Sequence, residues 1–248
     1  MALPPCAFWP IYQGMKYDFR TDLIYPKVES VTLDSGERTY MTPHGPAPSV
    51  TTILGTLPHP ELDAWKARLG QVEADRITKE AAEIGSYMHN LLETHVKAEP
   101  IPAPQNELQR MATQMFHCVR LIGLQRLEVV WGVETALFVG NLYAGRTDLV
   151  GVYDGLASII DYKTGLYPKK PKFVENYKMQ IAAYGLAHEE MFPGANNLIR
   201  QGVILVGIRP NEKYKKGPEL QKIILTDMEM DDYKLKWLRV VEEYHAGR

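Results

Sequence analysis

Two aspartates and a lysine near the middle of the chain have a spacing that suits metal-assisted hydrolysis. Asp148 and Asp161 lie thirteen residues apart, and Lys163 follows Asp161 by two. The pair Asp154-Gly155 lies between them, flanked by apolar residues, and predicts a two-residue hairpin turn with both turn residues at positive φ. In that register Asp148 falls opposite Asp161. Lys163 then projects from the same face as Asp161, because strand side chains alternate.

The predicted hairpin brings two carboxylates face to face, and like charges opposite each other destabilise a ladder. A divalent cation between them would remove this penalty, because hard cations prefer oxygen ligands. A lysine beside such a cation can polarise a scissile phosphate or help to activate water. A lone Asp-x-Lys triplet is more often a solvated surface pair, so the interpretation depends on what else the chain places nearby.

A helical segment upstream offers a histidine to the same site. Gly85, His89 and Glu93 are spaced four apart and share one face of a helix. A neutral imidazole is a good metal ligand, and a glycine inside a helix usually serves close packing or access. The alternative is a histidine that only hydrogen-bonds Glu93.

Three more polar residues lie within otherwise apolar elements. Glu134 interrupts a predicted strand, and a buried carboxylate there would either join the site or bond a neighbouring side chain. Gln180 and Tyr184 share a helical face, and the glutamine amide can both donate to and accept from a phosphate or a water. A structural Gln–Tyr pair is the alternative.

Positive charge gathers beside the hairpin, although the whole chain has a formal net charge of -2. Five lysines and one glutamate lie between Lys163 and Lys178, and a second basic cluster spans Arg209 to Lys222. A charge run is usually a solvated face, but next to a phosphate-cleaving centre a nucleic-acid backbone is the more economical target. The candidate DNA-binding residues are Trp65, Arg146, Lys169, Lys170, Lys172 and Lys178.

Composition describes an ordinary globular protein of 248 residues, 45% hydrophobic and 23% charged. The two cysteines, Cys6 and Cys118, exclude a four-cysteine metal cluster and a disulfide framework. They favour a reducing setting. No secretory signal or long apolar run is present, so we expect an intracellular, non-secreted protein, in the cytoplasm of a bacterial host if a phage encodes it.

Hydrophobic periodicity predicts a helical segment followed by a sheet-rich one. An antiparallel meander joined to a later strand by a helical crossover gives a mixed sheet flanked by helices, an α/β fold of the α+β type. The expected organisation is one domain over 1–248, with an irregular N-terminal segment (1–47), a helical lobe (48–126) and an α/β core (127–248). We expect a hairpin at 28–33 and 38–42, a short helix after the N-cap Ser49, helices at 61–98 (divided near Gly70), 106–124, 171–191 and 230–244, and strands at 127–139, 142–152, 156–162, 198–208 and 220–225.

The motifs GxxxHxxLE, GRTDL, DYKTG and QxxxY occur in that order and together resemble the PD-(D/E)XK nuclease superfamily, in particular its RecB-like branch. PSVTTIL at 48–54, Trp65-Lys66 and KWLRVVEEY at 236–244 further resemble the mitochondrial genome maintenance exonucleases and their phage and bacterial relatives. The resemblance covers about residues 40–245 in outline. It implies a restriction-endonuclease-like core and a DNA exonuclease that depends on Mg²⁺ or Mn²⁺.

The resemblance also implies roles for single residues. Asp148 and Asp161 match the metal-binding acids, and Lys163 matches the catalytic lysine. His89 matches a histidine at the metal, and the carbonyl oxygen of Tyr162 is expected as a further ligand. The aspartate at 161 and the GRTD motif depart from other branches but are usual in this one.

The fourth motif of that branch matches Gln180 and Tyr184. The four cysteines of its iron–sulfur members are absent, so we expect no cluster. Products with 5′-phosphates follow by analogy.

The helices before the sheet are more extensive than a minimal nuclease core needs. In the family resembled, such helices form an arch that a single strand threads. Here Trp65 could stack on a base, and a basic lining could come from Lys66, Arg68, Arg76 and Lys79. A core tryptophan and a solvated charged face are the alternative.

The expected substrate is therefore the free end of single-stranded DNA. We expect a monomer with no membrane association, working with a single-strand-binding or annealing protein. A first alternative is a double-strand 5′→3′ recombination exonuclease that works with an annealing protein. Others are a catalytically idle DNA-binding module and an unrelated sugar- or nucleotide-binding α+β protein.

Overall fold

The computed structural model describes residues 17–211 and 216–247. The predicted hairpin joins β6 (Tyr143–Tyr153) to β7 (Leu156–Gly165). Its turn residues Asp154 and Gly155 both have positive φ, 53° and 78°, as expected for this turn. The ladder continues outward for five paired positions and stops one residue short of the two aspartates.

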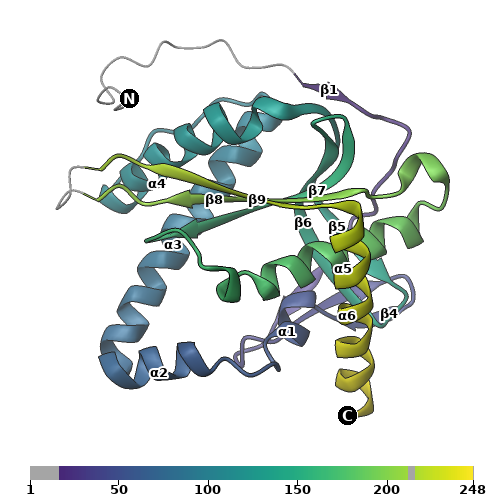
Figure 1. Cartoon of the computed structure of the whole chain (residues 1–248), viewed down its shortest axis with the longest axis horizontal. Coiled ribbons are helices and arrows are strands. Elements are labelled where there is room, and N and C mark those ends of the chain that lie inside the picture. Colours follow the sequence, from purple (N-terminus) through teal and green to yellow (C-terminus); the bar gives the residue numbers. More distant parts are fainter. Residues whose placement is uncertain (1–16, 212–215, 248) are drawn as a thin grey trace.

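This hairpin is the centre of a six-stranded mixed sheet in the order β1, β5, β6, β7, β8, β9 (Figure 1). β5, β6 and β7 form the antiparallel meander, β8 runs parallel to β7, and β9 returns antiparallel at the edge. The mixed sheet predicted from the sequence is therefore confirmed. The remaining strands of this sheet are β1 (Asp18–Phe19), β5 (Leu127–Val139), β8 (Gln201–Ile208) and β9 (Glu219–Leu225).

Each face of the sheet is covered by its own set of helices. Along β7, Ile159 packs in the cluster with α1, α5 and α6, whereas Ile160 packs in the cluster with α3 and α4. This period of two assigns Asp161 and Lys163 to the face of α5. The helices are α1 (Val50–Leu54), α3 (Gln71–Val96), α4 (Glu107–Cys118), α5 (Glu175–Met191) and α6 (Asp227–Ala246).

Three helices differ from their predicted bounds for local reasons. α6, predicted at 230–244, begins at Asp227 because Thr226 forms a capping box with Glu229. α4 is followed without a break by a π-helical turn (Val119–Gly123) and a 3-10 turn (Leu124–Arg126), and β5 begins after them. Pro171 starts a separate 3-10 turn (Pro171–Phe173), so α5 begins at Glu175. Proline has a fixed φ and no N–H, which suits the first position of such a turn.

The N-terminal part of the described chain forms a second, three-stranded sheet of β2 (Ser30–Thr32), β3 (Arg38–Thr42) and β4 (Gly45–Pro48). The hairpin predicted there is present, and β4 was not expected. Ser49 caps α1 as predicted, because its hydroxyl accepts a hydrogen bond from the Thr52 N–H at 2.9 Å.

α2 (Pro60–Leu69) and the first half of α3 extend away from the sheet and together form the α2 lobe (Figure 1). α2 has no buried residue, and apart from Ala74 the buried residues of α3 begin at Ile84. Gly70 separates the two helices, with a φ of 80° that favours glycine.

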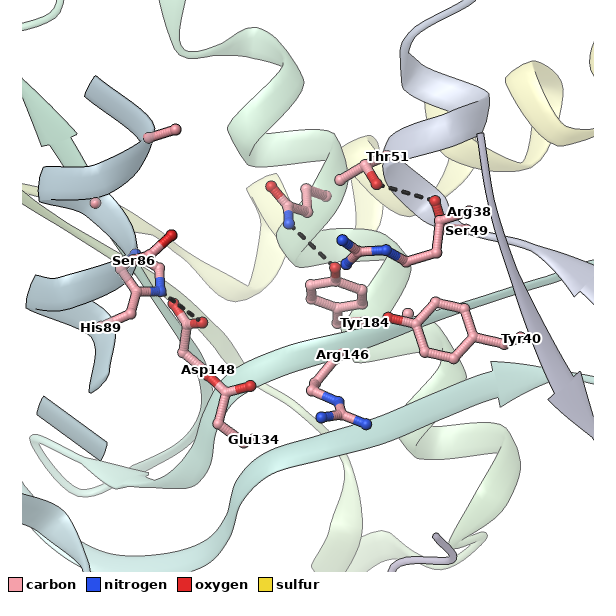
Figure 2. Close-up of a pocket in the computed structure, with 14 residues that line it drawn as sticks. Arg38, Tyr40, Ser49, Thr51, Ser86, His89, Glu134, Arg146, Asp148 and Tyr184 are labelled. Atoms are coloured by element: carbon pink, nitrogen blue, oxygen red, sulfur yellow. Dashed lines mark hydrogen bonds and ion pairs between the residues drawn. The ribbon is translucent and has the colours of Figure 1, made fainter. Parts of the chain in front are cut away.

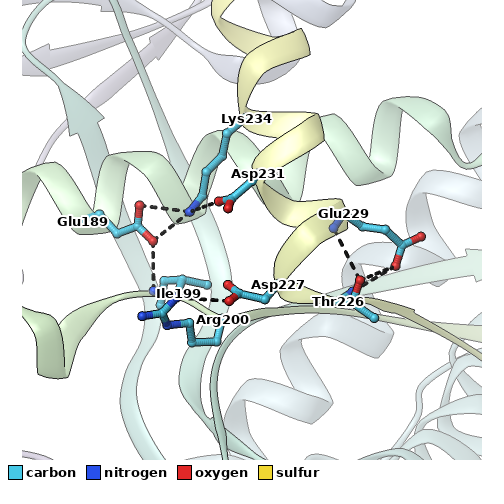
Figure 3. A network of polar contacts seen from close by, with 8 residues as sticks. All are labelled: Glu189, Ile199, Arg200, Thr226, Asp227, Glu229, Asp231 and Lys234. Atoms are coloured by element: carbon cyan, nitrogen blue, oxygen red, sulfur yellow. Dashed lines mark hydrogen bonds and ion pairs between the residues drawn. The ribbon is translucent and has the colours of Figure 1, made fainter.

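α5, which carries Gln180 and Tyr184, is held against α6 by a polar network (Figure 3). The Lys234 ammonium lies 2.8 and 3.0 Å from the two carboxylate oxygens of Glu189, and Glu189 also accepts a bond from the Ile199 N–H at 3.0 Å. Through Glu189, α5 is therefore connected to α6 and to the segment that leads into β8. None of the helices among residues 17–211 and 216–247 combines the length and apolar character needed to cross a bilayer.

Candidate active site

The strongest candidate site is a cavity of about 520 Å³ at the point where β6 and β7 diverge (Figure 2). Its wall combines three parts of the chain: the N-terminal sheet, α3, and the strands and helix of the core. The lining residues are Arg38, Tyr40, Ser49, Thr51, Ala82, Gly85, Ser86, His89, Glu134, Gly145, Arg146, Asp148, Gln180 and Tyr184.

Asp148 connects the two strands β6 and β7 to the helix α3. Its Oδ2 accepts a hydrogen bond from the backbone N–H of Tyr162 at 2.6 Å, beyond the last paired position of the β6–β7 ladder. Its Oδ1 lies 3.2 Å from Nδ1 of His89, so the side chain joins β6, β7 and α3. Burial alone would raise the pKa of Asp148, but His89, Lys163 and the Tyr162 N–H lower it, and the group is ionised.

Asp161 has a cationic partner of its own. It is only 3% exposed, and its Oδ2 lies 2.5 Å from Nζ of Lys163. Burial would lower the pKa of Lys163, yet the carboxylates of Asp161 and Asp148 raise it, so the lysine stays protonated. The sequence treats the aspartates as a repelling pair. In the structure His89 stabilises the Asp148 carboxylate, whereas Asp161 is paired with Lys163 but its pKa is still raised by burial and by repulsion from Asp148.

Glu134 is the strained member of the site. It lies between the pairs that β5 and β6 make on either side of Asp148, and its φ of 51° is unusual for a side-chain-bearing residue in a strand. Such a conformation costs about 1–3 kcal/mol and tends to occur at functional sites. Burial, followed by repulsion from Asp148 and Glu93, raises the pKa of Glu134 to about 7.

His89, Glu134 and Asp148 form the group that could hold a metal ion within the described part of the chain. Each offers one ligand atom, and these atoms all lie within 4.8 Å of one another. An imidazole with two carboxylates is a donor set that fits a divalent cation. Sequence reasoning placed Glu134 only in a supporting role. Asp161 and the Tyr162 carbonyl stay predicted ligands, and Oδ2 of Asp161 is paired with Lys163.

The helix α5 contributes a second polar pair. Gln180 Nε2 donates to Tyr184 Oη at 3.1 Å, and both residues line the cavity. Gly145 makes room for this pair, because a Cβ there would lie 2.5 Å from Cε1 of Tyr184. The glycine of the GRTDL motif is therefore a packing requirement, which the sequence did not reveal.

The comparisons agree with this geometry. Residues 106–248, more than half of the chain, match the family model of the PD-(D/E)XK nuclease superfamily. The chain belongs to the PD-(D/E)XK nuclease superfamily. Its mixed sheet with helices on both faces is the restriction-endonuclease-like α/β fold expected of this superfamily.

One relative and one solved structure can be placed beside it. The chain is 28% identical over 214 residues to mitochondrial genome maintenance exonuclease 1 of Mus musculus, which covers 79% of this chain. The chain spans only 58% of that protein's length. The crystal structure of LHK-Exo in complex with dAMP aligns over 65% of this chain and 80% of its own, with 13% identity and a TM-score of 0.33, too low to support an argument.

Gly85 and Glu93, the two ends of the GxxxHxxLE motif, contact residues other than His89. Glu93 pairs with Lys97 at 2.5 Å rather than with His89, so the alternative in which His89 only bonds Glu93 is wrong. A Cβ at Gly85 would lie 3.5 Å from Oγ1 of Thr164, which is ordinary van der Waals contact, so the packing of α3 on β7 does not require glycine at this position.

The residues predicted to bind DNA are in different situations. Arg146 and Lys170 are exposed, and Arg146 lines the cavity. Lys178 is less accessible, with an 18% exposed side chain over the Tyr233 ring. Trp65 is half-buried on a helix without buried residues, so it is not part of the core.

The rest of the basic residues are partly engaged within the chain. Lys172 Nζ lies 3.1 Å from Glu61 of α2, and Lys169 is half-buried. Arg76 is paired with Glu73 and Glu80. Lys66, Arg68 and Lys79 are further exposed cations of the α2 lobe. Two lysines of the second basic cluster, at 213 and 215, lie outside the described residues.

The cavity also contains residues for which no role in the site was predicted. Arg38 and Tyr40 come from β3, and Ser49 and Thr51 from the start of α1. Ser49 was recognised only as a helix cap. A signal for the others would require knowing that β3 lies beside β6, which sequence periodicity does not give.

The pairing of Asp161 with Lys163 predicts how the metal-free protein responds to substitution. Asp161→Asn removes the closest partner of a buried ammonium, so unfolding should require less free energy by about 3 kcal/mol. Asp161→Asn combined with Lys163→Met should recover much of this loss, because no unpaired charge remains. Urea unfolding in EDTA measures both variants. A double variant no more stable than the single one would show that the ion pair is not what Asp161 contributes.

Glu134 predicts a pH effect. Its pKa is raised from 4.5 to about 7 on folding, so between these values the folded state holds a proton that the unfolded state has lost. Stability of the metal-free protein should therefore fall as the pH rises through this window. Glu134→Gln should remove part of the fall, on the order of 1 kcal/mol, since some solvent reaches the group.

Chemical unfolding in EDTA at about pH 5 and about pH 8 measures the effect. Glu242→Gln, an exposed position on α6, is the control and should leave the pH dependence unchanged. A wild-type protein and a Glu134→Gln variant with the same pH dependence would rule out the raised pKa.

Proposed function

We propose that this chain is a metal-dependent deoxyribonuclease that removes nucleotides from free ends of single-stranded DNA. Its class as a PD-(D/E)XK-type nuclease follows from the family match. The observation that supports a working site is the convergence of His89, Glu134 and Asp148 beside a protonated lysine. An idle binding module or an unrelated sugar-binding protein has no use for this set.

In the proposed reaction, His89, Glu134 and Asp148 would hold the cation, with Asp161 nearby. A bound divalent cation supplies an activated water and neutralises charge on the phosphate. Lys163 stabilises the negative charge that develops on the phosphate oxygens. Its raised pKa favours this role over that of proton acceptor. Gln180, held by Tyr184, orients the phosphate or the water.

The donor set bears on the choice of metal. Imidazole suits Mn²⁺ better than Mg²⁺, which takes mostly oxygen ligands in rigid octahedral geometry. We therefore propose that Mn²⁺ binds this site more tightly than Mg²⁺, while either ion can support cleavage. No iron–sulfur cluster is part of the proposal.

We further propose that the protein is a single-domain monomer located inside the cell, that a phage encodes it, and that it works with a single-strand-binding or annealing protein. The double-strand recombination exonuclease with an annealing protein remains the second candidate. Digestion of end-labelled single- and double-stranded DNA with Mg²⁺, Mn²⁺ or EDTA separates the two candidates and tests the function itself.

Lys163 and the lysines that follow it should have separable effects. Lys163→Ala should lower turnover by about a hundredfold or more with little change in the Kd for DNA, because its charge acts on the transition state. Replacing Lys169, Lys170 and Lys172 together by Gln should weaken binding and flatten its salt dependence, because phosphate contacts are lost. Binding titrations and single-turnover kinetics distinguish them. Equal losses of affinity with turnover preserved in both would contradict this division of roles.

The position of α2 supports a threading requirement. α2 stands off the sheet, and Lys172 of the core contacts Glu61 in its first turn, which would close an arch around a strand. Linear single strands should be degraded, blunt duplexes poorly, and closed single-stranded circles not at all. Matched linear and circular forms of one sequence provide the measurement. Cutting of circles at the rate of linear strands would show an endonuclease without threading.

A further inference from the structure

The loop between β7 and α5, residues 166–173, exposes an unusual amount of apolar surface. Leu166, Tyr167 and Phe173 have exposed fractions of 52%, 60% and 43%. Exposed apolar side chains are common singly, but three within the eight residues of this loop call for a partner. The loop directly follows β7, the strand that carries Asp161 and Lys163.

Hydrogen bonds hold the backbone of the loop that carries the exposed rings at its start and in its middle. The Gln221 side chain bonds both backbone groups of Lys169, accepting from its N–H at 2.7 Å and donating to its carbonyl at 2.9 Å. The Arg209 N–H donates to the Gly165 carbonyl at 2.9 Å, and the 3-10 turn at Pro171–Phe173 closes the other end. A preorganised surface loses less entropy when a ligand binds.

Charge identifies the kind of ligand. Residues 166–173 contain three lysines and no acidic residue. Burial lowers the pKa of Lys169, and the positive charge of Arg209 lowers it further. Lys170 is exposed, while Lys172 lies over the Phe173 ring at 4.9 Å from its centroid. Aromatic rings interleaved with cations are the composition of surfaces that bind single-stranded nucleic acid, in which bases stack while phosphates meet lysines.

We propose that Tyr167 and Phe173 form a base-stacking platform for single-stranded DNA next to the cleavage site. The choice of DNA as ligand rests on the proposed function. Lys172 ties the platform to Glu61, at the foot of the α2 lobe, so a strand between the lobe and the core passes the loop. Stacking reads no sequence because every base offers a π-face, which suits an enzyme that degrades any strand.

Binding of a short fluorescent DNA strand, measured in EDTA, tests the platform without cleavage. A strand of the same length with abasic sites serves as the second ligand. Tyr167→Ala and Phe173→Ala should each weaken binding of the base-bearing strand by about tenfold and leave the abasic strand unchanged. Tyr167→Phe should keep the wild-type affinity, because the ring remains. Lys170→Gln should weaken both strands alike.

Phe19→Ala is the matched control, since Phe19 is 50% exposed on β1 at the far edge of the sheet, and it should change neither affinity. Wild-type binding by both alanine variants, or an equal loss for both strands, would overturn the platform and point to a protein partner or a structural role. A protein that shows the base dependence but never cleaves DNA would refute the proposed activity and keep the platform. An active nuclease whose binding does not depend on the bases would refute the platform and keep the proposed activity.

Discussion

The burial of charge where β6 and β7 diverge is the constraint on which the rest of the structure depends. Asp148 and Asp161 are both largely removed from water, and an unpaired carboxylate there would be prohibitively costly. Asp148 is paired with His89 of α3 and accepts from the Tyr162 N–H of β7, and Asp161 is paired with Lys163 on its own strand. This requirement fixes the position of α3 on the sheet and the end of the β6–β7 ladder.

Local patterns predicted much of the fold. The turn at Asp154-Gly155, the cap at Ser49 and the break at Gly70 are each determined by backbone preferences of single residues, so the sequence shows them directly. The bounds of β5 agree with its apolar pattern. β4 was missed because Gly45–Pro48 contains two prolines, which argue against a strand unless it lies at an edge.

The site was predicted less completely than the fold. His89 and the Asp-x-Lys triplet are found by spacing, because one helix face and one hairpin register bring them together. The left-handed backbone of Glu134, which turns it toward Asp148, is set by tertiary contacts and leaves no local signal. Arg38 and Tyr40 enter the cavity because a separate small sheet docks beside β6, a long-range arrangement that periodicity cannot show. The family match begins at residue 106, so Arg38, Tyr40 and His89 lie outside it.

A divalent cation held by His89, Glu134 and Asp148 is the central claim, and diffraction can test it directly. Crystals soaked in Mn²⁺ at a concentration that supports cleavage should give an anomalous difference peak in contact with Asp148 and His89, which a soak of Asp148→Asn crystals should lack. A fully occupied peak elsewhere, with none beside Asp148, would contradict the account.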